Sequence, residues 1–411
     1  LISFLIQGYG SISFSQVNEE WFRTFDDGYS PCLINDMAVD SDGNAYVVGD
    51  VSESNPASIS AFGIVKYNAN GDLLWSDLYK GSLNRLSYAE AVVVDKNNNV
   101  YVTGTCEDID SSKNFCTIKY NSSGGRIWIR KYQEAPGSRD YGIEICLDNE
   151  GNIYVLGNTY NNHVSTIKYD SSGNLLWVSH FDENLSISKT ASSVTVDVNK
   201  NVYITGTVYS NSSRSDFFTV KYDQNGNQQW VSFFNYANLN DLPCDIKLDN
   251  NRNVYILGRS MENDYNEFYT TVVKYDNNGN QLWSFVTDSI GLEGSNYYSL
   301  TMSLGIDKDG NSYIGTTCKY SCSLLKLDQD GFLLWNSKFN GQPEFISAIG
   351  RAVYIDNDGF IYVNGTVTKF LGSHDFCTLK YNSSGTLLWF RSFHSAMKSD
   401  DISSFVSVSN S

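Results

Sequence analysis

One short motif occurs seven times along the chain, and this repetition constrains the fold more than any other feature of the sequence. The motif consists of Asp, three turn-forming residues, Asn or Phe, any residue, and then Tyr followed by Val or Ile. Its copies are spaced 49 to 58 residues apart and begin at Asp40, Asp95, Asp148, Asp197, Asp249, Asp307 and Asp356. A recurring period near fifty residues indicates that one supersecondary unit is repeated.

A second motif follows the first in every copy. It reads Lys-Tyr-Asp/Asn-x-x-Gly-x-x-x-Trp, and its only departure at the Tyr position is Leu327. Its tryptophans are Trp75, Trp128, Trp177, Trp230, Trp283, Trp335 and Trp389. The eighth tryptophan, Trp21, begins a segment that matches the end of a unit without the rest of it.

Each unit is expected to form four antiparallel strands. In the second copy, apolar residues 91–94 suit a buried strand and residues 96–99 suit a turn, because Asn tolerates the left-handed region. Strands are expected at 100–103, 115–120 and 127–132, with a polar loop after the first of these. Gly124 supplies the positive φ that the last turn needs.

The predicted fourth strand carries a recurring aromatic pair. Residues four apart on a strand share a face, and Trp75 and Tyr79 show the pattern, which only Trp283 with Thr287 breaks. A repeated aromatic pair on one face suits packing of one sheet on the next. The tryptophans are therefore predicted to be core residues and not a ligand-binding surface.

Four short strands at a period near fifty are typical of propeller blades, so the expected fold class is an all-β, β-propeller of four-stranded antiparallel blades. Seven full blades are expected to close into a ring, and the alternative is eight with a split, incomplete closing blade. The expected organisation is a residual signal peptide at 1–15 and one propeller domain at 16–411. The repeats are expected to start near residues 33, 88, 141, 190, 242, 299 and 348.

The charge balance, the N-terminal segment and the cysteines indicate which partners and which location to expect. The chain carries 29 basic and 46 acidic residues, a net charge of −17, which disfavours nucleic acid and anionic membranes as partners. The apolar start 1–6 is too short to span a bilayer, and Ser13-Phe14-Ser15 resembles a cleavage site, so we expect a secreted or bacterial cell-surface protein. Export would permit disulfides across the hairpins holding Cys106/Cys116 and Cys318/Cys322, and buried free thiols are the alternative.

The two motifs together resemble the bacterial SBBP (seven-bladed beta-propeller) repeat, most clearly at 40–49, 168–177 and 380–389. The resemblance covers roughly residues 16–411. It implies a secreted or surface propeller of Bacteroidetes-like bacteria, often within a larger protein, and implies no agreed activity and no catalytic residues. Quinoprotein and sialidase repeats also place Asp, Gly and Trp in order, but their spacings differ from those of this chain.

Two groups of residues carry side chains suited to metal binding or acid–base chemistry. Asp40 with Asp42, and Asp307 with Asp309, resemble the first half of a calcium loop, but no Glu stands at the twelfth position. The alternative is a hairpin turn with an Asx-type hydrogen bond. The four histidines, His163, His180, His374 and His394, recur in no other copy, which makes a catalytic role weak. No cofactor is expected beyond this possible calcium.

A ligand site is expected on the face formed by the variable loops, because the opposite turns are short and repetitive. Tyrosine offers a flat apolar face with a polar tip, and carboxylates accept hydrogen bonds, which suits a glycan or protein partner. The candidates on this face are Tyr88, Arg139, Asp140, Tyr141, Asp241, Tyr265, Tyr297, Tyr298 and Asp401. Of these, the predicted ligand-binding residues are Tyr88, Asp140, Tyr141, Asp241 and Tyr298.

The function expected from the sequence is a binding or scaffold module that is monomeric or part of a larger chain. The alternative is a propeller hydrolase or lyase with its site at the channel mouth. Converging His, Glu or Asp side chains within about 4 Å of each other would favour the enzyme, because catalytic groups need hydrogen-bond reach.

Overall fold

The structure is a computed structural model of the chain. It describes residues 33–53, 59–81, 86–160, 163–181, 188–209, 214–237, 239–261, 268–287, 302–318, 321–341, 345–369 and 374–393. These residues divide into two compact units, which are called here the N-terminal unit (33–233) and the C-terminal unit (234–393). The described part of the chain contains no α-helix and no helix that could cross a membrane.

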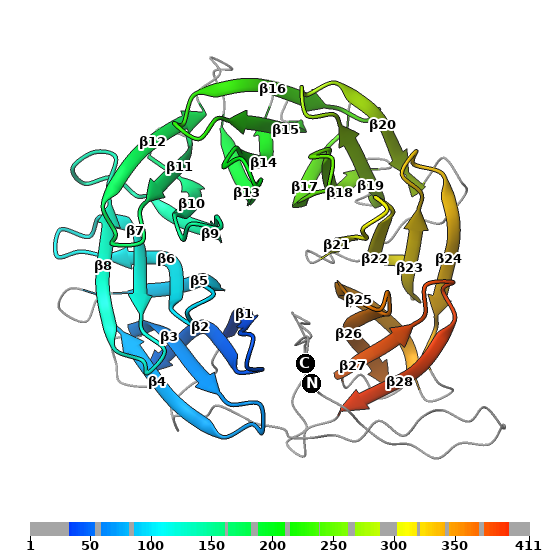
Figure 1. Cartoon of the computed structure of the whole chain (residues 1–411), viewed down its shortest axis with the longest axis horizontal. Coiled ribbons are helices and arrows are strands. Elements are labelled where there is room, and N and C mark those ends of the chain that lie inside the picture. The colour runs from blue at the N-terminus through cyan, green and yellow to red at the C-terminus, as the bar shows by residue number, and fades with distance from the viewer. Residues whose placement is uncertain are drawn as a thin grey trace. The chain divides into compact units, whose positions relative to one another are not determined.

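The N-terminal unit contains four sheets of four strands each (Figure 1). The first two are β1 (Leu33–Val39), β2 (Ala45–Glu53), β3 (Ile59–Tyr67) and β4 (Leu73–Tyr79), then β5 (Ser87–Val94), β6 (Val100–Glu107), β7 (Lys113–Tyr120) and β8 (Arg126–Tyr132). The next two are β9 (Tyr141–Leu147), β10 (Ile153–Asn158), β11 (Val164–Tyr169) and β12 (Leu175–Phe181), then β13 (Lys189–Val196), β14 (Val202–Tyr209), β15 (Ser215–Tyr222) and β16 (Gln228–Phe234).

The C-terminal unit contains three further sheets of the same kind. They are β17 (Asp241–Leu248), β18 (Val254–Met261), β19 (Phe268–Tyr275) and β20 (Gln281–Val286), then β21 (Ser303–Ile306), β22 (Ser312–Cys318), β23 (Ser321–Leu327) and β24 (Leu333–Phe339), then β25 (Phe345–Ile355), β26 (Ile361–Lys369), β27 (His374–Tyr381) and β28 (Leu387–Phe393). In all seven sheets, strands adjacent in sequence are adjacent in space.

The closed ring expected from the sequence is wrong. The seven four-stranded blades are present, but each is a separate sheet, and none pairs strands from the two ends of the described chain. An eighth, split blade is also missing from the described residues. The repeats specify the strands of one blade and its contact with the next, and they carry no signal for pairing between the first and last copies. The terminal segments, with the predicted signal peptide and Trp21, lie outside the described residues.

The first motif forms the turn between the first two strands of a sheet. In the third sheet, Asp148 Oδ1 accepts hydrogen bonds from the backbone N–H groups of Glu150 and Asn152, both at 2.9 Å. Its Oδ2 accepts from the Asn152 amide at 2.7 Å and the Tyr154 hydroxyl at 3.0 Å. The same Asp–Tyr bond occurs in the copies that begin at Asp40, Asp95, Asp197, Asp249 and Asp307. One carboxylate thus closes a hairpin and fixes a buried tyrosine.

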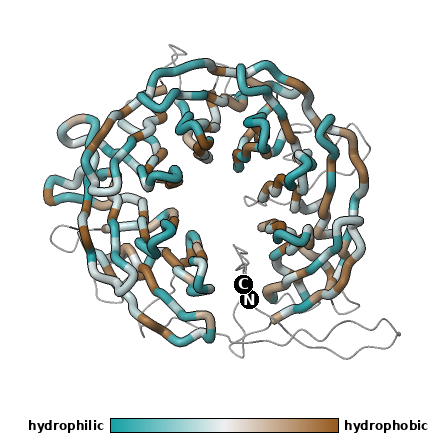
Figure 2. Tube along the Cα trace, viewed as in Figure 1, coloured by the Kyte–Doolittle hydropathy of each residue, from teal (hydrophilic) through white to brown (hydrophobic). Residues whose placement is uncertain are grey.

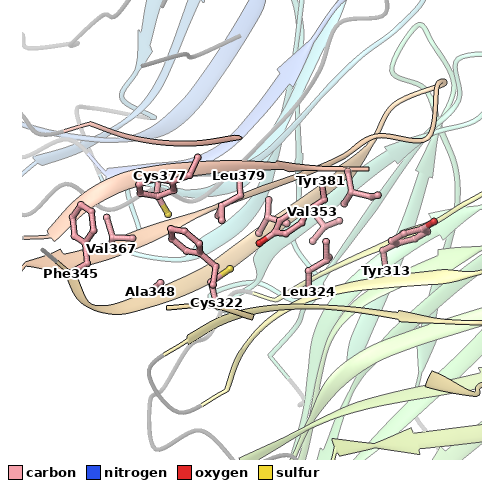
Figure 3. Packing of buried hydrophobic residues seen from close by; sticks show 14 residues of the cluster. Tyr313, Cys322, Leu324, Phe345, Ala348, Val353, Val367, Cys377, Leu379 and Tyr381 are labelled. Atoms are coloured by element: carbon pink, nitrogen blue, oxygen red, sulfur yellow. The ribbon is translucent and has the colours of Figure 1, made fainter. Parts of the chain in front are cut away.

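The hydrophobic core lies between consecutive sheets within each unit. Apolar and polar stretches alternate along the strands (Figure 2), so each sheet has apolar residues to pack against its neighbour. In the C-terminal unit, Cys322 and Leu324 of β23 pack with Cys377 and Leu379 of β27, as Figure 3 shows. Further clusters of buried apolar residues join the other neighbouring sheets inside each unit.

The second motif builds the contact between neighbouring sheets. Trp75 in β4 donates its indole N–H to the Ser122 carbonyl of the next sheet at 3.0 Å, and Lys66 donates to the same oxygen at 3.3 Å. Gly124, two residues after Ser122, lies against the flat indole, since a Cβ there would stand 2.7 Å from Trp75. Equivalent indole-to-carbonyl bonds are made by Trp128, Trp177 and Trp283. These four tryptophans therefore lie between sheets, as predicted.

We predict that Gly124→Ala destabilises the N-terminal unit by about 3 kcal/mol, because it combines a left-handed backbone with overpacking against the indole. Gly151→Ala is the matched control, since Gly151 has a φ of 80° against 84° for Gly124 but no neighbour closer than 3.9 Å. It should cost only about 1 kcal/mol, the backbone penalty alone. Urea unfolding measures both, and equal costs for the two variants would contradict the indole contact.

We also predict that the stabilising effect of Asp148 disappears in acid. Burial raises the pKa of Asp148, but the hydrogen bonds from Asn152, Tyr154 and Glu150 outweigh it, so the pKa lies below its ordinary value. A carboxyl with a lowered pKa stabilises the fold above its unfolded pKa, and this contribution is lost as the pH falls through the folded pKa.

Asp148→Asn should therefore be about 2 kcal/mol less stable than the wild type at pH 6, where the native carboxylate is charged. The difference should shrink as the pH falls through the folded pKa of Asp148, where the native side chain also becomes neutral. Urea unfolding from pH 6 to pH 2 measures it, and a difference that is constant or grows in acid would refute this account of the turn.

Candidate functional site

The segment 133–140 between β8 and β9 organises one loop region of the N-terminal unit (Figure 1). Asp140 is fully buried at its end. Its Oδ2 accepts hydrogen bonds from the Glu134 backbone N–H at 2.7 Å and the Ser138 hydroxyl at 2.6 Å, and its Oδ1 accepts from the Tyr160 N–H at 3.0 Å. The carboxylate thereby holds the segment closed and joins it to the end of β10.

The same segment is bonded to the preceding sheet through Lys113. The Lys113 N–H donates to the Ser138 carbonyl at 3.1 Å, and the Asp140 N–H donates to the Lys113 carbonyl at 2.7 Å. Arg139 forms a parallel bridge with Lys113 and is exposed. These bonds fix the position of β7 and of the segment relative to each other.

Three side chains converge beside this junction, and they are called here the tyrosine–lysine cluster: Tyr88, Lys113 and Tyr141. The Lys113 ammonium lies 5.8 Å from the centre of the Tyr88 ring and 5.1 Å from the centre of the Tyr141 ring. Tyr141 is 37% exposed, so its ring is open to a ligand. Both ring faces lie within cation–π range of one cation, which holds the three side chains together.

The surroundings keep Tyr88 in its neutral form. Burial raises its pKa, and the nearby carboxylates of Asp50 and Glu107 raise it further. The hydroxyl therefore stays protonated at neutral pH and can both donate and accept a hydrogen bond.

A second group, called here the Glu–His–His cluster, lies at the other end of the segment and consists of Glu134, His163 and His180. Glu134 Oε1 is 3.0 Å from His163 Nδ1, and the two imidazole ring centres are 5.7 Å apart. One potential ligand atom from each of the three side chains lies within 4.8 Å of the other two. Among the described residues, this is the one group of three or more His, Cys, Asp or Glu side chains so arranged.

The predicted ligand-binding residues have different environments. Tyr88 and Tyr141 come together in the tyrosine–lysine cluster, whereas Asp140 is buried as the support of the segment. Asp241 is also buried and accepts the Tyr236 N–H at 2.7 Å. Tyr298 lies outside the described residues, as do the further candidates Tyr265, Tyr297 and Asp401. Ligand binding at these positions stays a prediction.

The sequence analysis missed the Glu–His–His cluster because none of its members recurs. Register was the available signal: Lys168 pairs with Trp177, as the Lys and Trp of this motif do in other copies. Counting three residues outward from that pair places Ser165 opposite His180, with His163 two residues before Ser165. Nothing in the sequence indicated that Glu134 would turn toward them.

The structure also describes the Asp40 turn and two of the cysteines singled out from the sequence. The Asp40 turn has the Asx-type hydrogen bonds to backbone N–H groups that the sequence offered as its alternative. Calcium at Asp40, Asp42, Asp307 and Asp309 stays a prediction. Cys106 and Cys116 are free and buried. A hydrogen bond from Cys116 is the main cause that lowers the pKa of Cys106.

We predict that Asp140→Ala opens the segment without unfolding the sheets. Removing a carboxylate that accepts three hydrogen bonds destabilises each donor by more than about 1.4 kcal/mol. This free energy corresponds to a tenfold loss of protection from amide hydrogen exchange. Amide hydrogen exchange of peptides covering Glu134 and Tyr160 should accelerate at least about tenfold, while peptides from β10 and β11 keep wild-type rates. Unchanged exchange at Glu134 and Tyr160 would show that Asp140 does not hold the segment.

Comparison with known proteins identifies the repeat. The family model for the SBBP β-propeller repeat matches residues 127–163, which run from β8 to the residue before β11. No curated protein matches the chain.

Solved structures resemble it at low identity. The BP39L lectin from Burkholderia pseudomallei is 6% identical, with 87% of this chain and 98% of that chain covered and a TM-score of 0.50. The β-propeller domain of the Trilobed protease from Pyrococcus furiosus is 8% identical, with coverages of 87% and 98% and a TM-score of 0.47. A protein of unknown function from Bacteroides caccae is 11% identical, with coverages of 72% and 94% and a TM-score of 0.39. Seven four-stranded antiparallel sheets and a matching repeat make this chain a β-propeller repeat protein.

Proposed function

We propose that this chain is a non-catalytic binding module whose tyrosine–lysine cluster binds a carbohydrate. The observation that carries the proposal is the arrangement of Tyr88 and Tyr141 around one lysine, with the Tyr141 ring partly exposed. An exposed tyrosine ring beside hydrogen-bond donors is the surface that a sugar needs, because a sugar has an apolar ring face and a rim of hydroxyl groups.

The polar groups around the ring define the preferred ligand. Lys113 and the exposed Arg139 are both cationic donors, whereas the nearby Asp140 carboxylate is buried and already accepts three hydrogen bonds. The carboxylates of Asp50 and Glu107 stand near Tyr88 and can accept hydrogen bonds. The site therefore offers both donors and acceptors, which favours a glycan rich in hydroxyl groups.

The side chains of the tyrosine–lysine cluster are carried by ordered backbone, which suits ligand binding. Lys113 and Tyr141 belong to strands of neighbouring sheets, and Arg139 lies in a segment closed by a buried carboxylate. Groups held on strands lose little conformational freedom when a ligand binds. The likeness to the BP39L lectin concerns the fold alone, so the proposal rests on these side chains. We further propose that the protein acts outside the cell or at its surface, where such glycans occur.

A hydrolase or lyase is the second candidate function, and one observation favours it. The Glu134 carboxylate and the His163 imidazole are 3.0 Å apart, within the reach that acid–base catalysis requires. This pair would act on a substrate bound at the adjacent loops. Carbohydrate binding by the tyrosine–lysine cluster does not require the Glu134–His163 pair.

We predict that Tyr141→Ala weakens carbohydrate binding at least about tenfold, which corresponds to loss of an aromatic contact worth about 1.4 kcal/mol. Binding is first measured on an array of neutral and uronic-acid oligosaccharides. Calorimetry then measures the affinity for the oligosaccharide that binds most tightly. Phe332→Ala is the control, because Phe332 is an exposed aromatic residue (70%) in the β23–β24 turn.

The control variant should bind as the wild type does. Absence of binding to every oligosaccharide, or an equal loss in both variants, would refute the proposal. Release of reducing ends from the bound oligosaccharide, abolished in Glu134→Gln, would establish the enzyme instead.

A further inference from the structure

The Glu–His–His cluster is assembled by the register of one hairpin and the loop beside it. Ser165 in β11 lies opposite His180 in β12, and His163 stands directly before β11. Residues two apart on a strand share a face, so His163 and Ser165 are directed to the same side as His180. Glu134 reaches this side because its backbone N–H is bonded to Asp140.

A second layer of hydrogen bonds orients the imidazole of His180. Its Nδ1 lies 2.8 Å from the hydroxyl of Ser165, which is fully buried, and that hydroxyl lies 3.1 Å from the Thr159 hydroxyl. When Nδ1–H donates to Ser165, the lone pair of His180 is on Nε2, which is the tautomer a metal ligand needs. Metal-binding histidines are generally held in this way by a hydrogen bond at the other ring nitrogen.

The carboxylate of Glu134 is largely buried, and within the described part of the chain only one of its two oxygens has a hydrogen-bond partner. Its side chain is 14% exposed and that of His163 is 20% exposed. The hydrogen bonds of Thr159 go to Ser165 and the His163 carbonyl. Oε2 of Glu134 is buried and has no hydrogen-bond partner among the described residues.

These groups form the ligand set of an open metal site. Two imidazole nitrogens and one carboxylate oxygen bind Zn²⁺ at about 2.0–2.2 Å, which puts tetrahedral ligand atoms about 3.3 Å apart. The Glu134–His163 pair is already at 3.0 Å, and one potential ligand atom from each of the three side chains lies within 4.8 Å of the other two, so the ligand atoms need to approach by no more than about 1.5 Å. An imidazole-rich set favours Zn²⁺ over Ca²⁺ or Mg²⁺, which prefer oxygen ligands alone.

We propose that Glu134, His163 and His180 bind one Zn²⁺ ion through three protein ligands, with the fourth position open to water or to an anionic group of a ligand. Ser165 is a positioning residue that keeps Nε2 of His180 available. This site is independent of the proposed carbohydrate binding, since none of its residues belongs to the tyrosine–lysine cluster.

Zinc alone is the probe in the first experiment, with equilibrium dialysis of the whole chain and metal analysis. The wild type should bind one Zn²⁺ per chain, and His163→Ala and His180→Ala should each weaken binding at least about 100-fold. His374→Ala is the matched control, because His374 bonds to Thr368 through Nδ1 at 3.0 Å and lies outside the cluster. It should bind zinc as the wild type does.

Two further readouts separate this site from loose binding at cysteines or surface carboxylates. Co²⁺ in place of Zn²⁺ should give the visible absorption of a four-coordinate ion in the wild type and in His374→Ala, and not in His163→Ala. Zinc should raise the melting temperature of the same two proteins only. Binding below about 0.1 Zn²⁺ per chain, equal binding by wild type and His163→Ala, or a preference for Ca²⁺ over Zn²⁺ would each overturn the proposal.

Discussion

The structure depends on the contact between a tryptophan indole and the glycine turn of the following sheet. A single four-stranded sheet leaves one face of its apolar residues uncovered, so it needs a neighbour to form a core. The indole supplies a large flat apolar surface, and its N–H bonds to a carbonyl of the neighbouring turn, as Trp75 does with Ser122. Glycine is required opposite because any Cβ would occupy the space of the ring, as at Gly124.

The two motifs act together within one sheet. The tyrosine of the first motif lies opposite the lysine of the second, and that lysine lies opposite the tryptophan: Tyr101, Lys119 and Trp128 are one such row. The Lys119 ammonium stands 4.9 Å from the centre of the Tyr101 ring and donates to the carbonyl that the indole also reaches. The charge therefore remains bonded although the residue is buried, which explains why a lysine can recur in the core.

Repetition determined what could be predicted from the sequence. The strands, the Asp turns and the place of the tryptophans between sheets follow from residues that recur, because each copy confirms the others. Ring closure was predicted wrongly, since the contact between the ends has no second copy. For the candidate site, Tyr88 and Tyr141 were named from their place on the variable face, and ligand binding by them stays a prediction. The positions of Lys113 and Glu134 could not be predicted, because they depend on one loop held by Asp140.

The contact between indole and glycine is tested most directly by a double-mutant cycle of Trp75→Leu and Gly124→Ala in the N-terminal unit. Unfolding by urea, followed by circular dichroism, gives the free energy of each variant. If the indole is what excludes a side chain at Gly124, the alanine should cost about 2 kcal/mol less in the Trp75→Leu background than in the wild type. If the costs of the two single variants sum to the cost of the double variant within about 0.5 kcal/mol, the account is contradicted.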